Sequence, residues 1–565
     1  MTSFRKHFRS KTRSMDVAPD EIFLDSKNLP EFNTQQFEGR LEQTIPKRAA
    51  YYLAGFFIAV AILFGGRLGI LQISKGEAYA KQSENNSLHR DPIFADRGIV
   101  LDRNGVELAS NVQQENGDPF PHRKYIGAAG FGHLLGYVSY PSQDKAGFYW
   151  QSEFKGMAGV EKSFDDILKG ENGLRIVETD VKGNVQSENI TNPPQHGENI
   201  TLSIDSRVQE ELYKEIRQTA IDGSFVGGAG VIMDVHTGEI LGIASYPEYD
   251  SNILSDGGDA AAIKGYLSDK RKTFLNRAIA GLYAPGSIVK PFVAFGALDT
   301  GVVTPSTQIL STGSISIPNP YNPKMDSVFK DWRVNGYTDI RHAIAVSSDV
   351  YFYEVGGGYK SQRGMGILNI EKYTSMFGLA AKTGIDLPGE LEGVIPTPDW
   401  KEKTFPGTHW NVGDTYHTVI GQYGFQVTPL QMARGVAAIA NGGTLFTPHI
   451  LKDPAPTLAS TTIDLNPSFF QIVCEGMRLT VTEGTAPGLQ ISGLSVASKT
   501  GTAQVNLTTH TVNSWNEAFF PYENPKYAIV VVMENGPDSN SGATHVVHMV
   551  LDWMHVYTPE YTSTN

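Results

Sequence analysis

A serine and a lysine three residues apart stand at the start of an expected helix. In YAPGSIVKP (283–291), Pro-Gly breaks the chain just before Ser287, and an apolar run with helical spacing follows. Lys290 then lies one turn after Ser287 on the same face. A serine hydroxyl becomes a nucleophile when a base takes its proton, and a lysine can be that base where burial lowers its pKa. The helix N-terminus adds N–H groups where oxyanion charge develops.

This Ser-x-x-Lys spacing is a weak signal by itself. Only Ser287 has both the Pro-Gly break before it and the apolar helix after it. We attribute the other occurrences to chance; they are Ser3/Lys6, Ser142/Lys145, Ser152/Lys155 and Ser327/Lys330.

A second polar pair follows in VSSDVYF, where Ser347 and Asp349 are two residues apart. On a short loop, Ser347 could relay a proton, and Asp349 could orient a lysine or accept a substrate N–H. Serine and aspartate are also typical of a helix N-cap. The motif itself favours neither interpretation over the other.

A third group is SKTGT, with Lys499, Thr500, Gly501 and Thr502, inside a strand-like stretch. A lysine and two hydroxyls on an edge strand suit a substrate carboxylate, and the glycine lets the backbone come close to a ligand. A second Lys-Thr-Gly at 382–384 is interpreted as a turn.

Strands and helices must position these groups. Two short strands are expected at 230–235 and 239–244, with a tight loop between them. Near the C-terminus, 494–505 and 527–533 are predicted to be neighbouring strands, and apolar helices such as 429–441 lie between the two strand pairs. This order predicts an antiparallel sheet made from distant parts of the chain and covered by helices, which is an α+β fold.

An apolar segment near the start predicts a membrane anchor. Residues 49–66 are uncharged and mainly apolar, and with their flanks they can span the hydrocarbon core. The Lys and Arg residues before this segment place that end in the cytoplasm and everything after it outside. A cleaved signal peptide, with cleavage at 78–80, is the alternative, although the preceding tail is long for one.

Composition narrows the function classes. The chain has 565 residues, enough for two or three domains, and its net charge of -13 argues against broad nucleic-acid binding. Its single cysteine, Cys474, lies in an apolar run and is interpreted as a small buried hydrophobic residue. No Cys/His cluster has zinc-ligand spacing, and no phosphate-binding GxxxxGK[ST] loop occurs.

The three motifs, in this order, resemble the signature of penicillin-recognising serine enzymes. Asp349, where many relatives have Asn, favours the elongation type over the division type. Further segments resemble landmarks of class B penicillin-binding proteins. These segments are 97–105 (RGIVLDRNG), 133–138 (HLLGYV), 156–162 (GMAGVEK), 384–390 (GIDLPGE) and 427–433 (VTPLQMA).

The resemblance implies a fold and a domain order. We expect a single N-terminal transmembrane helix, an elongated pedestal domain and a transpeptidase domain, whose mainly antiparallel five-stranded sheet is flanked by helices. The expected bounds are 1–48 for a cytoplasmic tail, 49–72 for the transmembrane helix, 73–196 for a trimmed pedestal similar to the penicillin-binding protein dimerisation domain, and 197–565 for the transpeptidase domain.

The resemblance also implies a reaction. Ser287 attacks the D-Ala–D-Ala carbonyl of a peptidoglycan stem peptide, free D-Ala leaves, and an amine of a neighbouring stem takes the acyl group. Lys290 is the implied base and Ser347 the proton shuttle. Lys499 sets the local field, while Thr500 and Thr502 bind the terminal carboxylate. The remaining implied site residues are Asp349, which is catalytic, and Gly501, which binds substrate.

Partners and alternatives follow from the same resemblance. The expected partners are stem peptides, β-lactams, the cell membrane and a SEDS-family glycosyltransferase, with no nucleic acid and no cofactor. The catalytic domain is expected on the periplasmic or extracellular side. Two alternatives stay open: a hydrolase, meaning a D,D-carboxypeptidase or β-lactamase, and a β-lactam sensor or scaffold without turnover.

Some positions depart from the family pattern. Gly421-Gln422-Tyr423-Gly424 replaces the usual Gly-Gln-Gly, so that loop is expected to differ. Some elongation-type relatives carry a zinc site made with Asp, His and Cys. Here Tyr337 and Ser348 stand at the expected His and Cys positions, so no zinc is predicted.

Overall fold

The computed structural model describes most of the chain after residue 46. It covers residues 47–77, 79, 88–113, 118–145, 149–179, 185–320, 322, 324–457, 459–506, 508, 510–538 and 542–563. Almost all of the predicted tail, 1–48, and residues 78 and 80 of the alternative cleavage site therefore lie outside the described residues. The chain divides into two compact units, 1–88 with 179–184, and 89–178 with 185–565.

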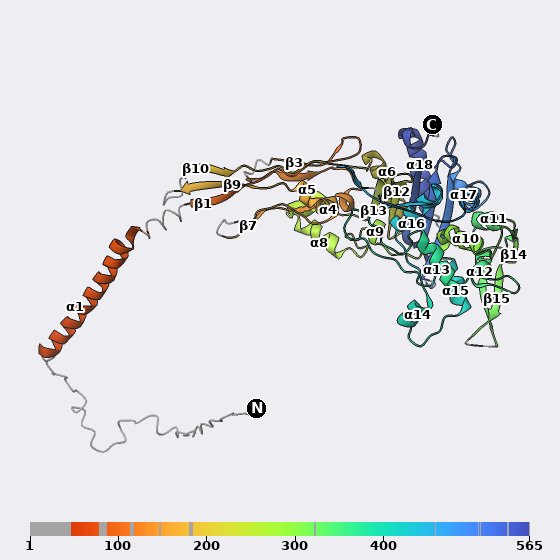
Figure 1. Cartoon of the computed structure of the whole chain (residues 1–565), viewed down its shortest axis with the longest axis horizontal. Helices are drawn as coiled ribbons and strands as arrows, with labels where there is room; N and C mark the ends of the chain where they lie inside the picture. Colours follow the sequence, from red (N-terminus) through yellow and green to blue (C-terminus); the bar gives the residue numbers. More distant parts are fainter. Residues whose placement is uncertain are drawn as a thin grey trace, which may run out of the picture. The chain divides into compact units, whose positions relative to one another are not determined.

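The first unit contains helix α1 (Lys47–Gly69), which passes into a short π-helical turn, η3 (Ile70–Ser74). Figure 1 draws this helix in orange-red. In the part of the chain that the structure describes, this is the one helix that is long and apolar enough to cross a membrane. Its apolar side chains are exposed all round, which suits a lipid environment.

The centre of the second unit is a five-stranded sheet with the order β13-β12-β23-β22-β21, in which every neighbouring pair is antiparallel. The strands are β12 (Gly227–Asp234), β13 (Ile240–Tyr246), β21 (Ala497–Asn506), β22 (Thr511–Phe520) and β23 (Tyr527–Pro537). The predicted fold class is therefore confirmed. The prediction that 494–505 and 527–533 are direct neighbours was wrong, because β22 lies between β21 and β23.

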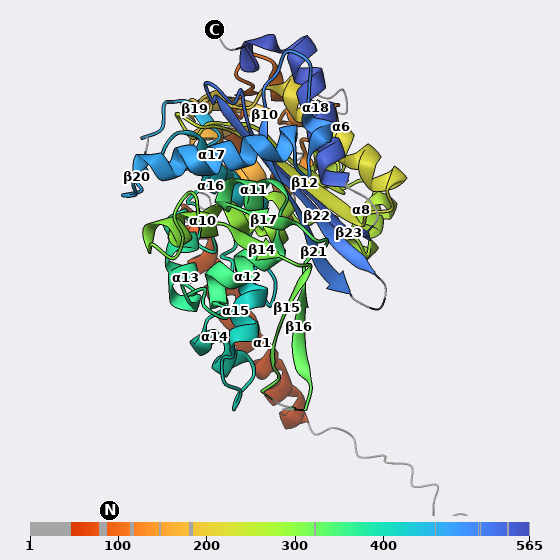
Figure 2. The same cartoon turned by 90° about the vertical axis from the view of Figure 1, so that its right-hand side faces the viewer.

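Helices cover both faces of this sheet, as Figure 2 shows. Helices α6 (Ser206–Asp222) and α18 (Gly542–Tyr557) pack on one face, and α16 (Pro429–Ala440) and α17 (Pro467–Thr482) pack on the other. The sequence explains the start of α6, because the Asp205 side chain accepts the Arg207 N–H as its N-cap. The α16 start is a capping box of Thr428 and Gln431.

Residues 206–561 also contain α10 (Lys290–Asp299) and further helices and short strands. They are α7 (Ser251–Asp256), α8 (Ala260–Ser268), α9 (Arg277–Ala280), η4 (Gly286–Val289), β14 (Ile309–Ser311), β15 (Ser314–Pro318), β16 (Asp326–Lys330), β17 (Gly336–Thr338), α11 (Ile340–Ala345), α12 (Asp349–Gly357), α13 (Ile367–Met376), α14 (Pro398–Thr404), α15 (Val412–Val419), β18 (Thr444–Phe446), β20 (Ser460–Thr462), η5 (Pro487–Leu489) and η6 (Pro559–Tyr561).

The N-terminal part of this unit is built on two more sheets, with orders β19-β11-β2-β3-β4 and β1-β9-β10. The landmark segment 97–105 contains β2 and leads into β3, which pairs with it antiparallel. The strands are β1 (Leu88–Ile93), β2 (Val100–Leu101), β3 (Glu107–Val112), β4 (His122–Tyr125), β9 (Gly173–Thr179), β10 (Val185–Asn192), β11 (Ile200–Leu202) and β19 (Leu451–Asp453). Short elements complete it: α3 (Gly132–Leu135), β5 (Val138–Ser139), β6 (Ser142–Gln143), β7 (Tyr149–Gln151), β8 (Lys155–Gly156), α4 (Gly159–Ser163) and α5 (Asp165–Leu168).

A buried charge cluster joins two of the sequence landmarks in this part. Arg97 and Arg123 donate to the two carboxylate oxygens of Glu161, at 2.5 and 2.7 Å, and all three side chains are almost fully buried. Burial alone would raise the pKa of Glu161, but the two arginines outweigh it and hold the pKa below its ordinary value. The buried ion cluster thus connects the landmark segment 97–105, through Arg97, with the landmark segment 156–162, through Glu161.

Candidate active site

Ser287 lies in the short 3-10 helix η4, directly before α10, as the Pro-Gly break predicted. The chain turns at Gly286, whose φ of +57° suits glycine. A Cβ on Gly421 would lie 2.3 Å from the Gly286 carbonyl oxygen, and Gly286 N donates to Gly421 O at 3.0 Å. The Gly421–Gly424 loop therefore holds the turn that carries Ser287.

Lys290 is the first residue of α10 and is fully buried. Its Nζ donates to Ser347 O at 2.8 Å and to Ser347 Oγ at 3.3 Å, and it lies 2.6 Å from Asp349 Oδ1. In the described part of the chain, none of its hydrogen bonds goes to Ser287. The structure thus joins Lys290 to the second motif, where Asp349 was expected to orient a lysine.

The Ser347–Asp349 segment combines both interpretations of its sequence. Ser348 is the N-cap of α12, and its Oγ accepts the Tyr351 N–H. The residues on either side, Ser347 and Asp349, turn their side chains to Lys290 instead. Where the side chains of Ser347 and Ser348 turn to different partners, Ser347 has a φ of +56°, a left-handed conformation that costs a serine on the order of 1 kcal/mol.

Lys499 comes to the same hydroxyl from the edge strand β21. Its Nζ donates to Ser347 Oγ at 2.8 Å and to Thr500 O at 2.7 Å, and its side chain is fully buried. Burial lowers the pKa of Lys499 well below its ordinary value, and the charge of Lys290 lowers it further. Ser347 Oγ therefore lies between two lysine amines.

The edge strand also lies directly against the Ser287 turn. A Cβ on Gly501 would come within 3.0 Å of Pro285 O and 2.8 Å of Ile288 Cγ2, so glycine allows this close approach. Thr500 is half-buried, and its Oγ1 hydrogen bonds with Thr485 Oγ1 at 2.6 Å, whereas Thr502 is exposed. Hydroxyls thus line the strand beside the serine.

Two residues of this neighbourhood were not predicted as site residues. The Thr485 hydroxyl joins the site through its hydrogen bond with Thr500 Oγ1. Asp331 lies in a loop after β16, and its carboxylate accepts Ser348 Oγ at 2.7 Å together with the Asp349 and Val350 N–H groups at 3.1 and 3.2 Å. Asp331 therefore fixes the start of α12 and the loop that carries the second motif.

The two positions considered above for zinc, Tyr337 and Ser348, have different surroundings. Ser348 donates to Asp331, while Tyr337 on β17 points to solvent with 67% of its surface exposed. Within the described residues, no group of three or more His, Cys, Asp or Glu side chains is arranged to hold a metal ion.

Two other predictions concern residues outside the cluster. Lys382–Gly384 lies in an irregular segment rather than a strand, and Thr383 and Gly384 donate to Glu390. Cys474 on α17 is partly buried, and burial raises the pKa of its thiol to about 12, which makes it a poor nucleophile.

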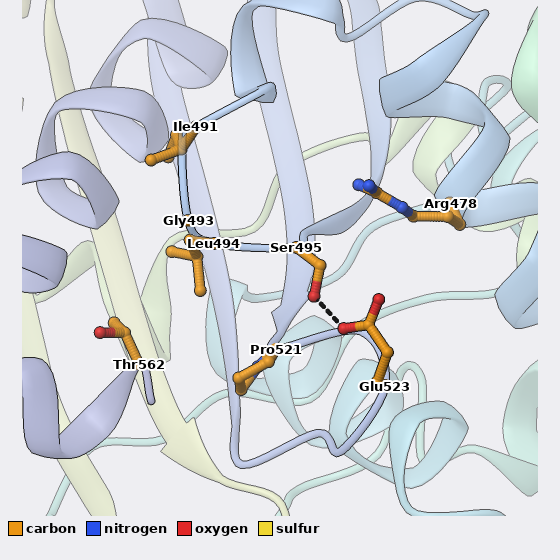
Figure 3. Close-up of a pocket in the computed structure, with 8 residues that line it drawn as sticks. All are labelled: Arg478, Ile491, Gly493, Leu494, Ser495, Pro521, Glu523 and Thr562. Atoms are coloured by element: carbon orange, nitrogen blue, oxygen red, sulfur yellow. Dashed lines mark hydrogen bonds between the residues drawn. The ribbon is translucent and has the colours of Figure 1, made fainter. Parts of the chain in front are cut away.

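A hollow of about 350 Å³ lies elsewhere on this unit, around the start of β21 (Figure 3). Arg478, Ser495 and Glu523 are among its lining residues, and Ser495 hydrogen bonds to Glu523. None of the three motifs contributes to its wall. In the motif cluster, Ser287 is half-buried, whereas Lys290 and Lys499 are fully buried.

Comparisons with known proteins agree with this arrangement. The family model of the penicillin-binding protein transpeptidase domain matches residues 228–552, more than half of the chain. The model of the penicillin-binding protein dimerisation domain matches residues 117–202. The peptidoglycan D,D-transpeptidase MrdA of Haemophilus influenzae is 31% identical over 471 residues, which are 77% of this chain and 69% of that protein.

Solved structures give the same result. The complex between PBP2 and MreC from Helicobacter pylori has a chain that matches with a TM-score of 0.69 and 28% identity, over 83% of this chain and 98% of that one. A peptidoglycan synthase complex described as coordinating polymerization and crosslinking has a chain with a TM-score of 0.69 and 26% identity, over 90% and 98%. The chain therefore belongs to the class B penicillin-binding proteins of the elongation type, and it is a peptidoglycan D,D-transpeptidase of cell-wall synthesis.

Proposed function

We propose that Ser287 carries the acyl group in this transpeptidase and that Ser347 relays protons between two lysines. The observation that carries this proposal is the position of Ser347 Oγ, 3.3 Å from Lys290 Nζ and 2.8 Å from Lys499 Nζ. A hydroxyl both donates and accepts, so it can pass a proton from one amine to the other.

In acylation, Lys290 takes the proton of Ser287 Oγ as the new C–O bond forms on the donor D-Ala carbonyl. The backbone N–H groups of Ser287 and Thr502 stabilise the oxyanion. The C–N bond then breaks, and the leaving D-Ala amine takes a proton from Ser347 Oγ, which receives in its place the proton that Lys290 took from Ser287. Deacylation runs the same steps in reverse with the acceptor amine of a second stem peptide.

The other site residues bind and orient. Thr500 and Thr502 hold the terminal carboxylate of the donor stem, and Gly501 lets the strand come close to it. Lys499 supplies positive charge beside this carboxylate. Asp349 holds Lys290 in place at 2.6 Å.

We also propose the cellular placement that the sequence predicts. The segment 49–72 anchors the chain in the cell membrane with the tail 1–48 in the cytoplasm, and the pedestal (73–196) and transpeptidase domain (197–565) lie on the outer side. Support comes from α1, which is long and apolar enough to span a bilayer.

The proposed partners are a SEDS-family glycosyltransferase and β-lactams. The peptidoglycan synthase complex supports the first, since its description joins polymerization with crosslinking, and the PBP2–MreC complex supports an MreC-like protein as a further partner. The transpeptidase family supports β-lactam binding, because these drugs acylate the same serine.

Intact mass spectrometry of the full chain in detergent, incubated with a penicillin, tests the nucleophile. We expect an adduct of the drug's mass in the wild type and none in Ser287→Ala. An adduct that survives in Ser287→Ala would overturn the assignment. Product analysis with a stem-peptide donor then separates transfer from hydrolysis: cross-linked product with an amine acceptor supports the transpeptidase, and hydrolysed product alone supports the D,D-carboxypeptidase alternative.

A further inference from the structure

Glu517 on β22 is a buried acid that the proposed mechanism does not use. It is fully buried, and neither of its carboxyl oxygens accepts a hydrogen bond from the described residues. Burial raises its pKa well above the ordinary value, and Lys499 acts in the opposite direction. An ionised carboxylate without a donor is costly inside a protein, so a charge nearby must compensate or the group must be neutral.

The strand register places Glu517 beside Lys499. The two residues are direct cross-strand partners in the β21–β22 pair, and side chains of such partners lie on the same face of a sheet. That face is the one that carries Trp515 and Phe519 into the main core. The partner of Glu517 on its other side, Val530 of β23, is apolar. Of the two cross-strand neighbours, Lys499 is thus the charged one.

Charged groups on the surrounding elements are engaged elsewhere or already belong to the site. Lys290 from α10 and Asp349 from α12 act on Lys499, and they pair with each other at 2.6 Å. The charged side chains of the two helices packed on this face bind other groups: on α17, Glu475 pairs with Arg341 and Arg478 donates to Val496 O, and on α16, Arg434 donates to Phe446 O.

We propose that Glu517 is a positioning residue that acts through Lys499, holding this lysine in its cationic form against burial and the repulsion of Lys290. The inference rests on the proposed role of Lys499 at the substrate carboxylate and at Ser347. The two groups then titrate as a coupled pair, so removing the charge of one changes the proton affinity of the other. The carboxylate needs no contact with substrate for this effect.

The test is the pH profile of acylation by a fluorescent penicillin, measured with the full chain in detergent. Glu517→Gln keeps the size of the side chain and removes its charge. Without the negative neighbour Lys499 loses its proton at lower pH, so the alkaline limb of the profile moves to lower pH by about one unit or more. An unchanged limb would show that Glu517 is a permanently neutral acid, and a limb moved upward would give the wrong sign; either result overturns the proposal.

Two further variants complete the experiment. Glu523→Gln removes a carboxylate from the loop after β22, outside the motif cluster, and is expected to leave the profile unchanged. Glu517→Leu replaces a polar group without hydrogen-bond partners by an apolar one and serves if Glu517→Gln does not fold. The alkaline limb of its pH profile must move to lower pH in the same way. A wild type that forms no adduct would instead refute the proposed function, which distinguishes the two failures.

Discussion

Replacing Asp331 by alanine removes an acceptor that fixes the second motif from outside the catalytic cluster. Among the described residues, six groups donate to this carboxylate, at distances between 2.7 and 3.2 Å; they are Ser311 Oγ, Trp332 N, Asn335 Nδ2, Ser348 Oγ, Asp349 N and Val350 N. The last three belong to the start of α12 and bear directly on the position of Ser347 and Asp349.

The size of the effect follows from those contacts. Each buried donor that loses its acceptor costs about 1–3 kcal/mol, and water can replace part of this because Asp331 is only half-buried. Ser348 still caps Tyr351 N. We therefore expect Asp331→Ala to lower the free energy of unfolding by about 3 kcal/mol. A displacement of the catalytic loop by about 1 Å further predicts a loss of roughly a hundredfold in acylation.

The assay is the second-order rate constant for acylation by a fluorescent penicillin, measured well below the melting temperature so that the folded fraction is complete. Asp326→Asn, an exposed acid on β16 that accepts Ser316 Oγ, is the matched control. Asp331→Asn keeps one acceptor oxygen and should fall between the wild type and alanine. A wild-type rate constant in Asp331→Ala would refute the view that this carboxylate positions Ser347 and Asp349.

Two more outcomes follow from the geometry. Ser347→Gly and Ser347→Ala both remove the relay hydroxyl and should slow acylation about a hundredfold or more. Because glycine tolerates the φ of +56°, the Ser347→Gly protein should melt at a higher temperature than the Ser347→Ala protein. A wild-type acylation rate in Ser347→Gly would exclude the relay. Glu161→Gln should cost about 3–5 kcal/mol at neutral pH by leaving Arg97 and Arg123 partly unpaired. Because the pKa of Glu161 is lowered in the fold, its stabilisation is present above its ordinary value of 4.5 and is lost as the pH falls through the lower pKa, so the melting difference between the two proteins should shrink in acid.

The local signals in the sequence predicted much of this site. Ser287 and Lys290 were found because Pro-Gly and an apolar helix are adjacent in sequence to them, and the edge strand of Lys499 because its pattern is continuous. Contacts between distant segments had no such signal. Asp331 stands alone in a polar loop, and nothing in its neighbours indicates that it holds the start of α12.

Strand β22 was missed for a related reason. Its sequence, TVNSWNEAFF, places Asn513, Asn516 and Glu517 where a buried strand is expected to be apolar, so the periodicity that identifies strands is interrupted. In the fold these residues are nevertheless buried. Polar residues that serve the interior of a site look like surface residues until the register of the sheet is known.

The order of strands in the catalytic sheet has a consequence for the time at which the enzyme becomes active during its synthesis. Strand β12 pairs with β23, which lies about 300 residues further along the chain, and such distant pairing is slow to form. At a translation rate of roughly 5–20 residues per second, Ser287 leaves the ribosome many seconds before Lys499 and β23 do. Until β23 has emerged, the central sheet of a nascent chain therefore cannot form with the strand order of the folded enzyme.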